Sequence, residues 1–523
     1  MRITLCERQE NPTTTGKKNP TTTMNRLFLP QRAKLTGFVL VALVLLSGFS
    51  YRIITTRADL QRIPYVPSPQ SISLGHPTFE DVREYEHTLP QHRMSVLAAN
   101  PRPRYLFFPW EAWGTGWNNV FQEQLLNTHL AYLANRGYVF VDYIARDHPP
   151  FPDELSDGTR HMLHIPMNAL TSGPTGGGSW GEGANPGTPR PVSKDWWMSA
   201  CPAHETVEVH LPNTVKELNI TDSTTGEERL VRWAEKLLKI EAACVTITDG
   251  SPFDYMFIGG DKVLSIWASS GNFSYGNSPT LKEYAWSALV TRAISRNFAL
   301  LSSDALPPAL SPTLSRITTG PGAGSVHVPY PLNAFSPLRA AAPPIRGLLA
   351  LHLRRGDYEE HCNNLAWWGA GFNAWNAFGE PPARETGRYP PLPDYLSQHT
   401  NESRFDAALR HCWPSPEAIM ERVRTVRAEA HGQQLSTVYM ATNGKPEWVA
   451  DVATKLRADG WAMVSSSIEM QLARDEFAVS QAVDMGVLVA AETFIGVGFS
   501  SLTSNVVQLR LAGGRGPSTS RFW

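Results

Sequence analysis

The sequence predicts an α/β protein with two doubly wound, parallel-sheet domains that follow a single N-terminal transmembrane helix. The chain has 523 residues, which is long for one hydrophobic core and favours two domains. From residue 104 onward, short apolar runs alternate with stretches of helical spacing, as expected for parallel strands joined by helices. Near the start, residues 35–51 carry no charge and are long enough to cross a thin bilayer.

The charge balance argues against nucleic acid as a partner. The chain holds 47 Lys and Arg residues against 48 Asp and Glu residues, with a pI of about 7.0. A nucleic-acid-binding domain usually carries a basic patch or a high pI. Charged residues make up only 18% of the chain, and its 39 Gly and 41 Pro indicate a globular protein with long ordered loops.

The first 51 residues are interpreted as a cytosolic tail (1–34) and a membrane anchor (35–51). The tail is polar and basic, so the positive-inside rule places it in the cytosol and the rest of the chain in the lumen of the endoplasmic reticulum or Golgi. A cleaved signal peptide is the alternative, with Gly48 and Ser50 near its cleavage site. A basic lead of 34 residues is long for a signal peptide and favours an uncleaved, single-pass type II anchor.

The five Cys residues fit this topology. Cys6 lies in the cytosolic tail, and the other four lie in the lumenal part, where two disulfides can form. The simplest pairing joins Cys201 to Cys244 and Cys362 to Cys412, because each bond then stays within one domain. Three pairings are possible, and the sequence does not choose among them. No Cys/His set has zinc spacing, so a structural metal is not expected.

The first domain is predicted to span residues 104–344, after a Pro-rich stem (52–103) without a clear period. It opens with a βαβ unit and closes with an interdomain linker. Its predicted elements are a strand at 105–108, a Gly-rich turn at 113–119, a helix at 120–136, a strand at 138–144, an inserted loop at 172–190, a helix at 232–240, a strand at 244–248, a helix at 281–299 and the linker at 302–344.

The second domain is predicted to span residues 345–523. It opens with an apolar strand that ends in His352, and a long aromatic insertion follows at 358–416. The remaining predicted elements are helices at 417–429, 447–459, 477–491 and about 498–511, and strands at 437–441, 461–464 and 493–497.

Three loops of the second domain follow strands, at the sheet edge where ligands bind in doubly wound folds. They are His352–Asp357, Thr442–Gly444 and Ser500–Thr503. The guanidinium groups of Arg354 and Arg355 can each grip two phosphate oxygens. The serine hydroxyls at a helix start suit an anion. The alternatives are a solvated basic turn, a plain turn and ordinary helix capping.

Asp484 lies inside an apolar helix, where a carboxylate is unusual, and it can bond a backbone group or a buried Arg instead of a ligand. The chain combines arginines with Ser/Thr-containing loops and has no P-loop lysine motif. This combination indicates a site that binds a nucleoside diphosphate and does not hydrolyse it.

The segment from His352 to Asp357 resembles the H-x-R-R segment of the GDP-fucose-dependent fucosyltransferases, the superfamily of protein O-fucosyltransferases and α1,6-fucosyltransferases. Phe494-Ile495-Gly496, followed by Ser500-Ser501-Leu502-Thr503, is similar to the late F-I-G…S-S-x-T segment of that family. The loop from Gly114 to Asn119 resembles its N-terminal Gly-rich loop. The order and rough spacing agree over about residues 104–144 and 346–511, and the middle of the chain is not matched.

The resemblance implies a GT-B fold, two Rossmann-like domains facing a cleft, and an inverting transfer of fucose from GDP-fucose to a protein Ser/Thr hydroxyl without a metal or other cofactor. Arg354 would bind the β-phosphate and assist departure of GDP, and His352 would contact the nucleotide-sugar. The diphosphate wall would comprise Arg355, Asp357, Asn443, Asp484, Ser500, Ser501 and Thr503. The first domain would present Gly114, Gly116, Asn118 and Asn119, with Asn118 beside the reacting groups.

One departure from the family concerns the base. Some protein O-fucosyltransferases carry a Glu between the two glycines of the N-terminal loop, and here that position is Thr115. Either another carboxylate serves, with Glu111 the nearest, or departure of GDP precedes deprotonation of the acceptor. The alternative functions are the same fold with a glycan acceptor or another GDP-sugar, and a non-catalytic lumenal binding protein.

Overall fold

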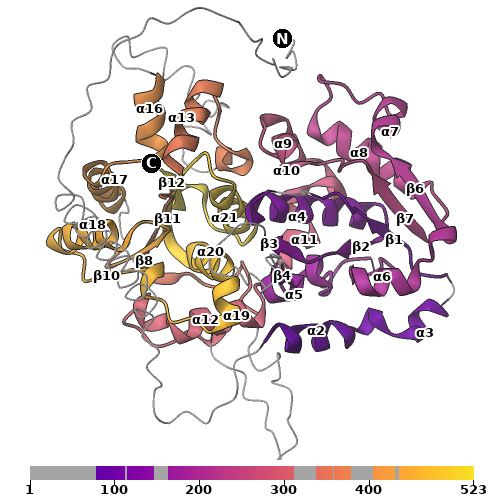
Figure 1. Cartoon of the computed structure of the whole chain (residues 1–523), viewed down its shortest axis with the longest axis horizontal. Helices are drawn as coiled ribbons and strands as arrows, with labels where there is room; N and C mark the ends of the chain where they lie inside the picture. The colour runs from indigo at the N-terminus through magenta and orange to yellow at the C-terminus, as the bar shows by residue number, and fades with distance from the viewer. Residues whose placement is uncertain are drawn as a thin grey trace, which may run out of the picture. The chain divides into compact units, whose positions relative to one another are not determined.

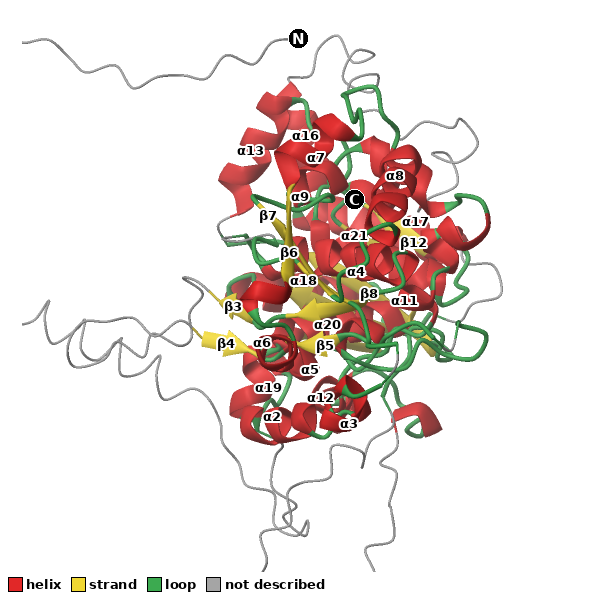
Figure 2. Cartoon of the chain, turned by 90° about the vertical axis from the view of Figure 1, so that its right-hand side faces the viewer, coloured by secondary structure: helices red, strands yellow, loops and turns green. Residues whose placement is uncertain are grey.

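The computed structural model describes residues 78–99, 101–111, 115–145, 163–185, 187–310, 337–356, 358–378, 404–429 and 435–523. All of them fall in one compact unit, Gly75–Trp523. Two five-stranded sheets organise this unit, and every strand pair in both is parallel (Figure 1). Figure 2 shows strands in the interior with helices around them. The predicted α/β class with two parallel sheets is therefore confirmed.

The first sheet has the strand order β5-β2-β1-β7-β6. Its strands are β1 (Tyr105–Phe107), β2 (Gly137–Phe140), β5 (Val192–Ser193), β6 (Thr206–His210) and β7 (Cys244–Thr248). The helix α4 (Trp117–Leu133) connects β1 to β2, which confirms the predicted βαβ unit. The predicted strand at 138–144 divides into β2 and β3 (Tyr143–Ala145), and β3 pairs with β4 (Leu163–Ile165) in an antiparallel ribbon.

The second sheet has the order β10-β9-β8-β11-β12. Its strands are β8 (Ile345–Leu353), β9 (Thr437–Thr442), β10 (Met463–Ser466), β11 (Ala491–Gly496) and β12 (Ser520–Phe522). The chain runs from β8 outward to β10 and then crosses to β11 on the other side of β8. The order of strands thus reverses between β8 and β11, and this topological switch point is where open α/β sheets bind ligands.

Two predicted helices are interrupted. The expected helix at 281–299 consists of α11 (Pro279–Lys282) and α12 (Ala288–Arg296), separated by an extended segment in which Trp286 donates its main-chain N–H to Leu338. The expected helix at 477–491 consists of α19 (Arg474–Ala478) and α20 (Ser480–Ala490). The other helices named below are α6 (Lys194–Ala200), α7 (Leu211–Glu217), α8 (Gly226–Leu238), α13 (Tyr358–Trp368), α16 (Arg404–Cys412), α17 (Pro416–Glu429), α18 (Pro446–Ala458) and α21 (Ser501–Ala512).

The predicted stem is folded over residues 78–99, contrary to expectation. Two helices form there, α2 (Phe79–His87) and α3 (Met94–Leu97), and Thr78 and Asp81 close a capping box at the start of α2. Val82 is buried, and the main-chain N–H of Phe79 donates to the Asp475 carboxylate at 2.8 Å. These contacts attach α2 to the rest of the unit, so the folded region begins well before residue 104.

Both disulfides have the predicted simplest pairing. Cys201 pairs with Cys244 at a Cα–Cα distance of 5.7 Å, and Cys362 pairs with Cys412 at 5.8 Å. The first ties the end of α6 to β7, and the second joins α13 to α16, which lie side by side in Figure 1.

The region predicted to cross the membrane, residues 35–51, lies outside the described residues. Among the helices that are described, none has the length and apolar character needed to span a bilayer.

Candidate functional site

The switch point of the second sheet holds a buried contact between the two predicted motifs. His352 lies near the end of β8, and its Nδ1 is 2.9 Å from the hydroxyl oxygen of Thr503 on α21. Both side chains are buried. Burial, with a smaller contribution from the charge of Arg354, lowers the pKa of His352 to about 3, so the imidazole is neutral at physiological pH. The segment that begins at His352 and the segment that ends at Thr503 therefore meet at the switch point.

Arg354 directly follows the last residue of β8, at the carboxyl ends of the strands of the second sheet. Its side chain is half-buried, and its guanidinium carbon lies 5.4 Å from the centre of the Tyr358 ring at the start of α13. A cation over the face of an aromatic ring is stabilised by the ring quadrupole. Arg354 is thus held next to the switch point while remaining partly accessible.

Arg355 is buried, and its side chain contacts two tryptophan rings and a main-chain oxygen. Its guanidinium carbon lies 4.5 Å from the ring centre of Trp413 and 4.2 Å from that of Trp448, and the guanidinium also donates to the main-chain oxygen of Pro414. The main-chain N–H of Arg355 donates to Asn443 Oδ1 at 2.7 Å. Burial lowers the pKa of Arg355 to about 10, which still leaves it charged. Arg355 and Asn443 therefore fix the loop that carries Arg354.

Ser500 and Ser501 form the start of α21, directly beyond β11. Ser500 occupies the N-cap position but makes no side-chain capping bond, and both serines are half-buried. Asn376 shapes the preceding turn by donating to the main-chain oxygens of Gly498 at 2.7 Å and Ser500 at 3.3 Å. The first N–H groups of a helix have no partner within the helix, so this end attracts anions.

Asp484 lies on α20, where it accepts a hydrogen bond from the Tyr439 hydroxyl at 2.5 Å. Burial raises the pKa of Asp484 to about 7, although the tyrosine opposes that rise. The contact bridges α20 to β9. Asp484 thus bonds a tyrosine, and neither of the partners expected from the sequence, a backbone group or an arginine, appears among its hydrogen bonds to described residues.

We call the part of the molecule built on the first sheet the first half, and the part built on the second sheet the second half. The first half contributes the start of α4 to the site. Gly116 is its N-cap, and Asn119 is half-buried in its first turn. Asn118 is buried, and its main-chain oxygen and Oδ1 accept from Asn505 Nδ2 on α21 at 2.9 and 3.2 Å. Asn118 Nδ2 also donates to Gln481 Oε1 on α20 at 3.3 Å. The start of α4 therefore contacts both helices that border the switch point. Gly114 and Asp357 lie outside the described residues.

A pocket of about 480 Å³ lies at the carboxyl edge of the first sheet, and the sequence did not indicate it. Its lining includes Arg83, Phe107, Phe108, Glu111, Thr115, Phe140, Asp142, Tyr143, His164, Ser193, Lys194 and Asp195. We call it the Glu111 pocket.

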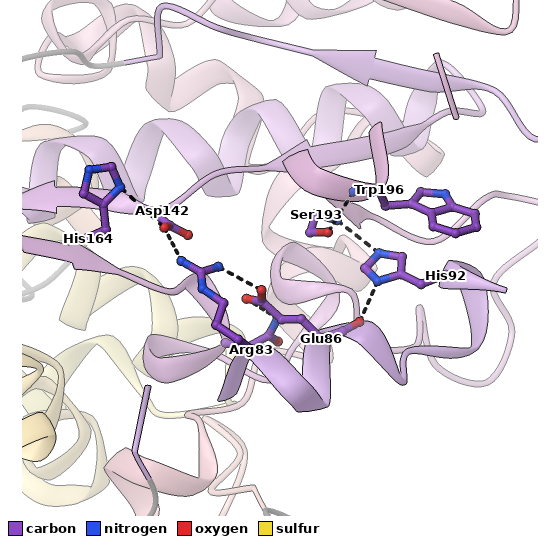
Figure 3. A network of polar contacts seen from close by, with 8 residues as sticks. Arg83, Glu86, His92, Asp142, His164, Ser193 and Trp196 are labelled. Atoms are coloured by element: carbon purple, nitrogen blue, oxygen red, sulfur yellow. Dashed lines mark hydrogen bonds and ion pairs between the residues drawn. The ribbon is translucent and has the colours of Figure 1, made fainter. Parts of the chain in front are cut away.

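The helix α2 contributes Arg83 to the lining of the Glu111 pocket, and Figure 3 shows the polar network around this side chain. Arg83 pairs with Asp142 and with Glu86, the latter at 2.9 Å, and Asp142 also faces His164 at 3.6 Å. His92 extends the same network. Its Nε2 accepts a hydrogen bond from the main-chain N–H of Ser193, and its Nδ1 donates one to the main-chain carbonyl of Glu86. Arg83 was missed because it lies in the predicted stem, although the Thr78–Asp81 capping box was readable in the sequence.

The fold and the site define an α/β protein that presents a cation and helix-start hydroxyls at the switch point of one sheet, and a carboxylate-containing pocket at the same edge of the other. No protein-family model matches the sequence, and no curated protein matches it. Several solved structures resemble the fold.

A crystal structure of POFUT1 in complex with GDP shares 14% identity, covers 80% of this chain and 97% of its own, and has a TM-score of 0.45. POFUT1 in complex with GDP-fucose gives 14% identity, 80% and 98% coverage and a TM-score of 0.44. Another crystal form of that complex gives 13% identity, 82% and 99% coverage and a TM-score of 0.42. At these scores the similarity assigns no function to the chain.

Proposed function

We propose that this protein is an inverting glycosyltransferase of GT-B architecture that transfers fucose from GDP-fucose to a hydroxyl group of a protein Ser or Thr. The observation that carries the proposal is the meeting of the segments that resemble fucosyltransferase motifs. His352 contacts Thr503 across the switch point, and Asn118 contacts Asn505 four residues after Ser501. Segments more than a hundred residues apart in sequence thus converge on one place, as parts of one site would.

Arg354 is the proposed phosphate ligand. It is partly accessible beside the switch point, and a guanidinium can bind two oxygens of a diphosphate and stabilise the charge that develops as GDP leaves. Ser500, Ser501 and the first N–H groups of α21 would bind the remaining oxygens. In this scheme Arg354 supplies the positive charge that a divalent ion supplies in many other phosphate sites, so the proposed reaction needs no metal.

The other predicted ligands would support this contact. Because the Arg355 guanidinium is packed between two tryptophans, we propose that Arg355 and Asn443 position the loop, and a direct contact of either with the nucleotide stays a prediction. His352, neutral and buried, would orient Thr503 and contact the nucleotide-sugar. Asp484 would hold the wall of the site through Tyr439.

The proposed location is the lumen of the endoplasmic reticulum or Golgi, with residues 35–51 as a type II anchor. Two disulfides support it, because such bonds persist in oxidising compartments. The uncharged segment after a basic tail supports the anchor.

The test is a thermal-shift titration of the full chain with GDP, GDP-fucose, GDP-mannose and UDP. A ligand that binds only the folded state raises the melting temperature, by an amount that grows with its concentration over Kd. We expect stabilisation by GDP and GDP-fucose that is lost in Arg354→Ala and kept in Arg424→Ala, an exposed arginine paired with Asp459. Stabilisation by GDP-mannose in preference to GDP-fucose would indicate another donor, and no response to any nucleotide would favour a non-catalytic protein.

A further inference from the structure

The Glu111 pocket carries a carboxylate at a place that suits a reacting group. Glu111 follows β1, on the loop that leads into α4, and the residue is 8% exposed. Aromatic side chains line the pocket around it, among them Phe107, Phe140 and Tyr143. A concave, mostly apolar pocket with a few placed polar groups is the usual form of a small-ligand site.

Glu111 is held in a fixed orientation by two neutral donors. The Tyr138 hydroxyl on β2 donates to Oε2 at 2.5 Å, and Asn127 Nδ2 on α4 donates to Oε1 at 2.9 Å. Asn127 also donates to the hydroxyl of Ser251, in the loop after β7, at 2.9 Å. Because the strand order of the first sheet reverses between β1 and β7, these bonds place Glu111 at that sheet's own switch point.

Within the part of the chain that the structure describes, no cation is among the hydrogen-bond partners of Glu111. Burial raises its pKa to about 7, and the bonds from Tyr138 and Asn127 oppose the rise. The other titratable neighbour near Tyr138 is Glu123 on α4. The remaining charged or titratable groups that line the pocket are Arg83 on α2, Asp142 after β2, Tyr143 on β3, His164 on β4, and Lys194 and Asp195 on α6.

The charges of Arg83 and Asp142 offset each other, because the two side chains form an ion pair. Glu111 differs from Asp142, because its hydrogen bonds to described residues come from the neutral donors Tyr138 and Asn127 and not from an arginine.

The pocket reaches the part of α4 that contacts the second half. Thr115 and Val120 line it, and Asn118 between them bonds Asn505 on α21 and Gln481 on α20. Asn505 lies one helical turn after Ser501. The carboxylate pocket and the proposed phosphate site are therefore linked through the first turn of one helix.

We propose that the Glu111 pocket receives the hydroxyl-bearing part of the acceptor and that Glu111 is the base that takes the hydroxyl proton. This inference rests on the proposed function. In the step, the acceptor oxygen forms a bond to C1 of the sugar, and the bond from C1 to the β-phosphate oxygen breaks. GDP leaves with that electron pair, and the acceptor proton passes to the Glu111 carboxylate. The aromatic walls would pack against the apolar face of the acceptor around its hydroxyl.

The test uses water as the acceptor, so that no acceptor need be known. Full-length wild type and Glu111→Gln are each given GDP-fucose, and released GDP is measured from pH 5 to pH 9. In wild type we expect the rate to rise with pH with a midpoint near the pKa of Glu111. In Glu111→Gln we expect a loss of about 100-fold and no such rise, because a positioned base contributes roughly 10²–10⁴-fold. Glu217→Gln, an exposed glutamate on α7 paired with Lys236, is the matched control and should behave as wild type.

Tyr138→Phe separates a base from a merely structural carboxylate. Removing the hydroxyl removes a bond that favours the ionised form of Glu111, so the midpoint of the rate should move to higher pH while the plateau is kept. An unchanged midpoint in Tyr138→Phe would overturn the inference, as would an unchanged pH profile in Glu111→Gln.

GDP-fucose binding is measured in every variant by thermal shift. Wild type that binds GDP-fucose but releases no GDP at any pH overturns the assignment of Glu111 and leaves the donor site intact. Wild type that does not bind GDP-fucose overturns the proposed function itself, and the inference with it.

Discussion

The two sheets carry opposite chemistry at equivalent places. Each sheet reverses its strand order beside its first strand, between β1 and β7 in one and between β8 and β11 in the other. The second switch point presents Arg354 and the start of α21, which suit an anion. The first presents Glu111, which suits a proton. The same arrangement of parallel strands therefore supplies two sites, and the loops after the strands decide what each can bind.

Burial acts on both sites in the same direction, toward neutral side chains. It lowers the pKa of His352 to about 3 and raises that of Glu111 to about 7. Arg354 is only half-buried and packs against the Tyr358 ring. Burial thus favours the neutral forms of His352 and Glu111, whereas the arginine proposed to bind the phosphate lies nearer to solvent.

The largest expected effect is that of Arg354→Ala. Removing a charged donor from a developing phosphate charge should lower GDP-fucose turnover by about 10³-fold. GDP affinity should also fall, because a charge-assisted hydrogen bond is lost. Steady-state kinetics and calorimetric GDP titration check the two effects. Turnover within a few-fold of wild type would remove Arg354 from the proposed site, and Arg424→Ala controls for general loss of positive charge.

Removing either disulfide should affect the two halves differently. The bonds close loops of 43 and 50 residues, so each is expected to contribute about 4 kcal/mol to the free energy of unfolding in the chain-entropy account. Urea unfolding of the paired Cys→Ser variants measures this. The Cys362/Cys412 variant should also bind GDP more weakly, because α13 carries Tyr358 under Arg354. Equal loss of GDP binding in the Cys201/Cys244 variant would contradict a division of the sites between the halves.

Acid should destabilise the second switch point through His352. Its folded pKa is about 3 against 6.5 for the free side chain, so the unfolded state takes up the proton first as the pH falls. The free energy of unfolding should therefore fall through this window, and His352 should account for about 2 kcal/mol of the loss at pH 5. His352→Gln should lose less stability than wild type between pH 8 and pH 5 in urea titrations. Parallel pH curves for the two proteins would show that the imidazole titrates normally.

The smallest expected effect is on the link between the two sites. Asn118→Ala leaves the buried Nδ2 of Asn505 with one acceptor fewer and should lower stability by about 1–2 kcal/mol. Donor turnover should fall more than GDP affinity, because the first half shifts relative to α21. Asn119→Ala, at a half-buried neighbouring position, is the comparison. An Asn118→Ala variant with wild-type stability and turnover would indicate that the start of α4 does not couple the sites.

Long buried elements were predictable from the sequence and short or context-dependent ones were not. The strand Cys244–Thr248 was predicted at its observed bounds, and α17 and α18 were each predicted within one residue. The strand β5 has two residues and β12 has three, and such short strands depend on their neighbours in the sheet more than on their own pattern. The helix expected at 281–299 is broken because the main chain at Trp286 pairs with Leu338 instead of continuing a helix.

The two candidate sites also differ in how far they could be predicted from the sequence. His352 and Ser500 end apolar runs, so their loops could be placed at a sheet edge from the sequence alone. The Glu111 pocket needs α2, β2 and α6 together, and Arg83, Asp142 and Lys194 share no local pattern. The burial of Arg355 between two tryptophans was likewise invisible, because Trp413 and Trp448 are distant from it in sequence.

The most direct test of the two-site account is calorimetric titration of GDP into wild type, Arg354→Ala and Glu111→Gln, each as the full chain. The account predicts tight binding to wild type and Glu111→Gln, and a loss of about 100-fold in Arg354→Ala, since a charged hydrogen bond contributes up to about 3 kcal/mol. Binding that is weakened equally by both substitutions, or by Glu111→Gln alone, would contradict the assignment of the phosphate to the second sheet and of the proton to the first.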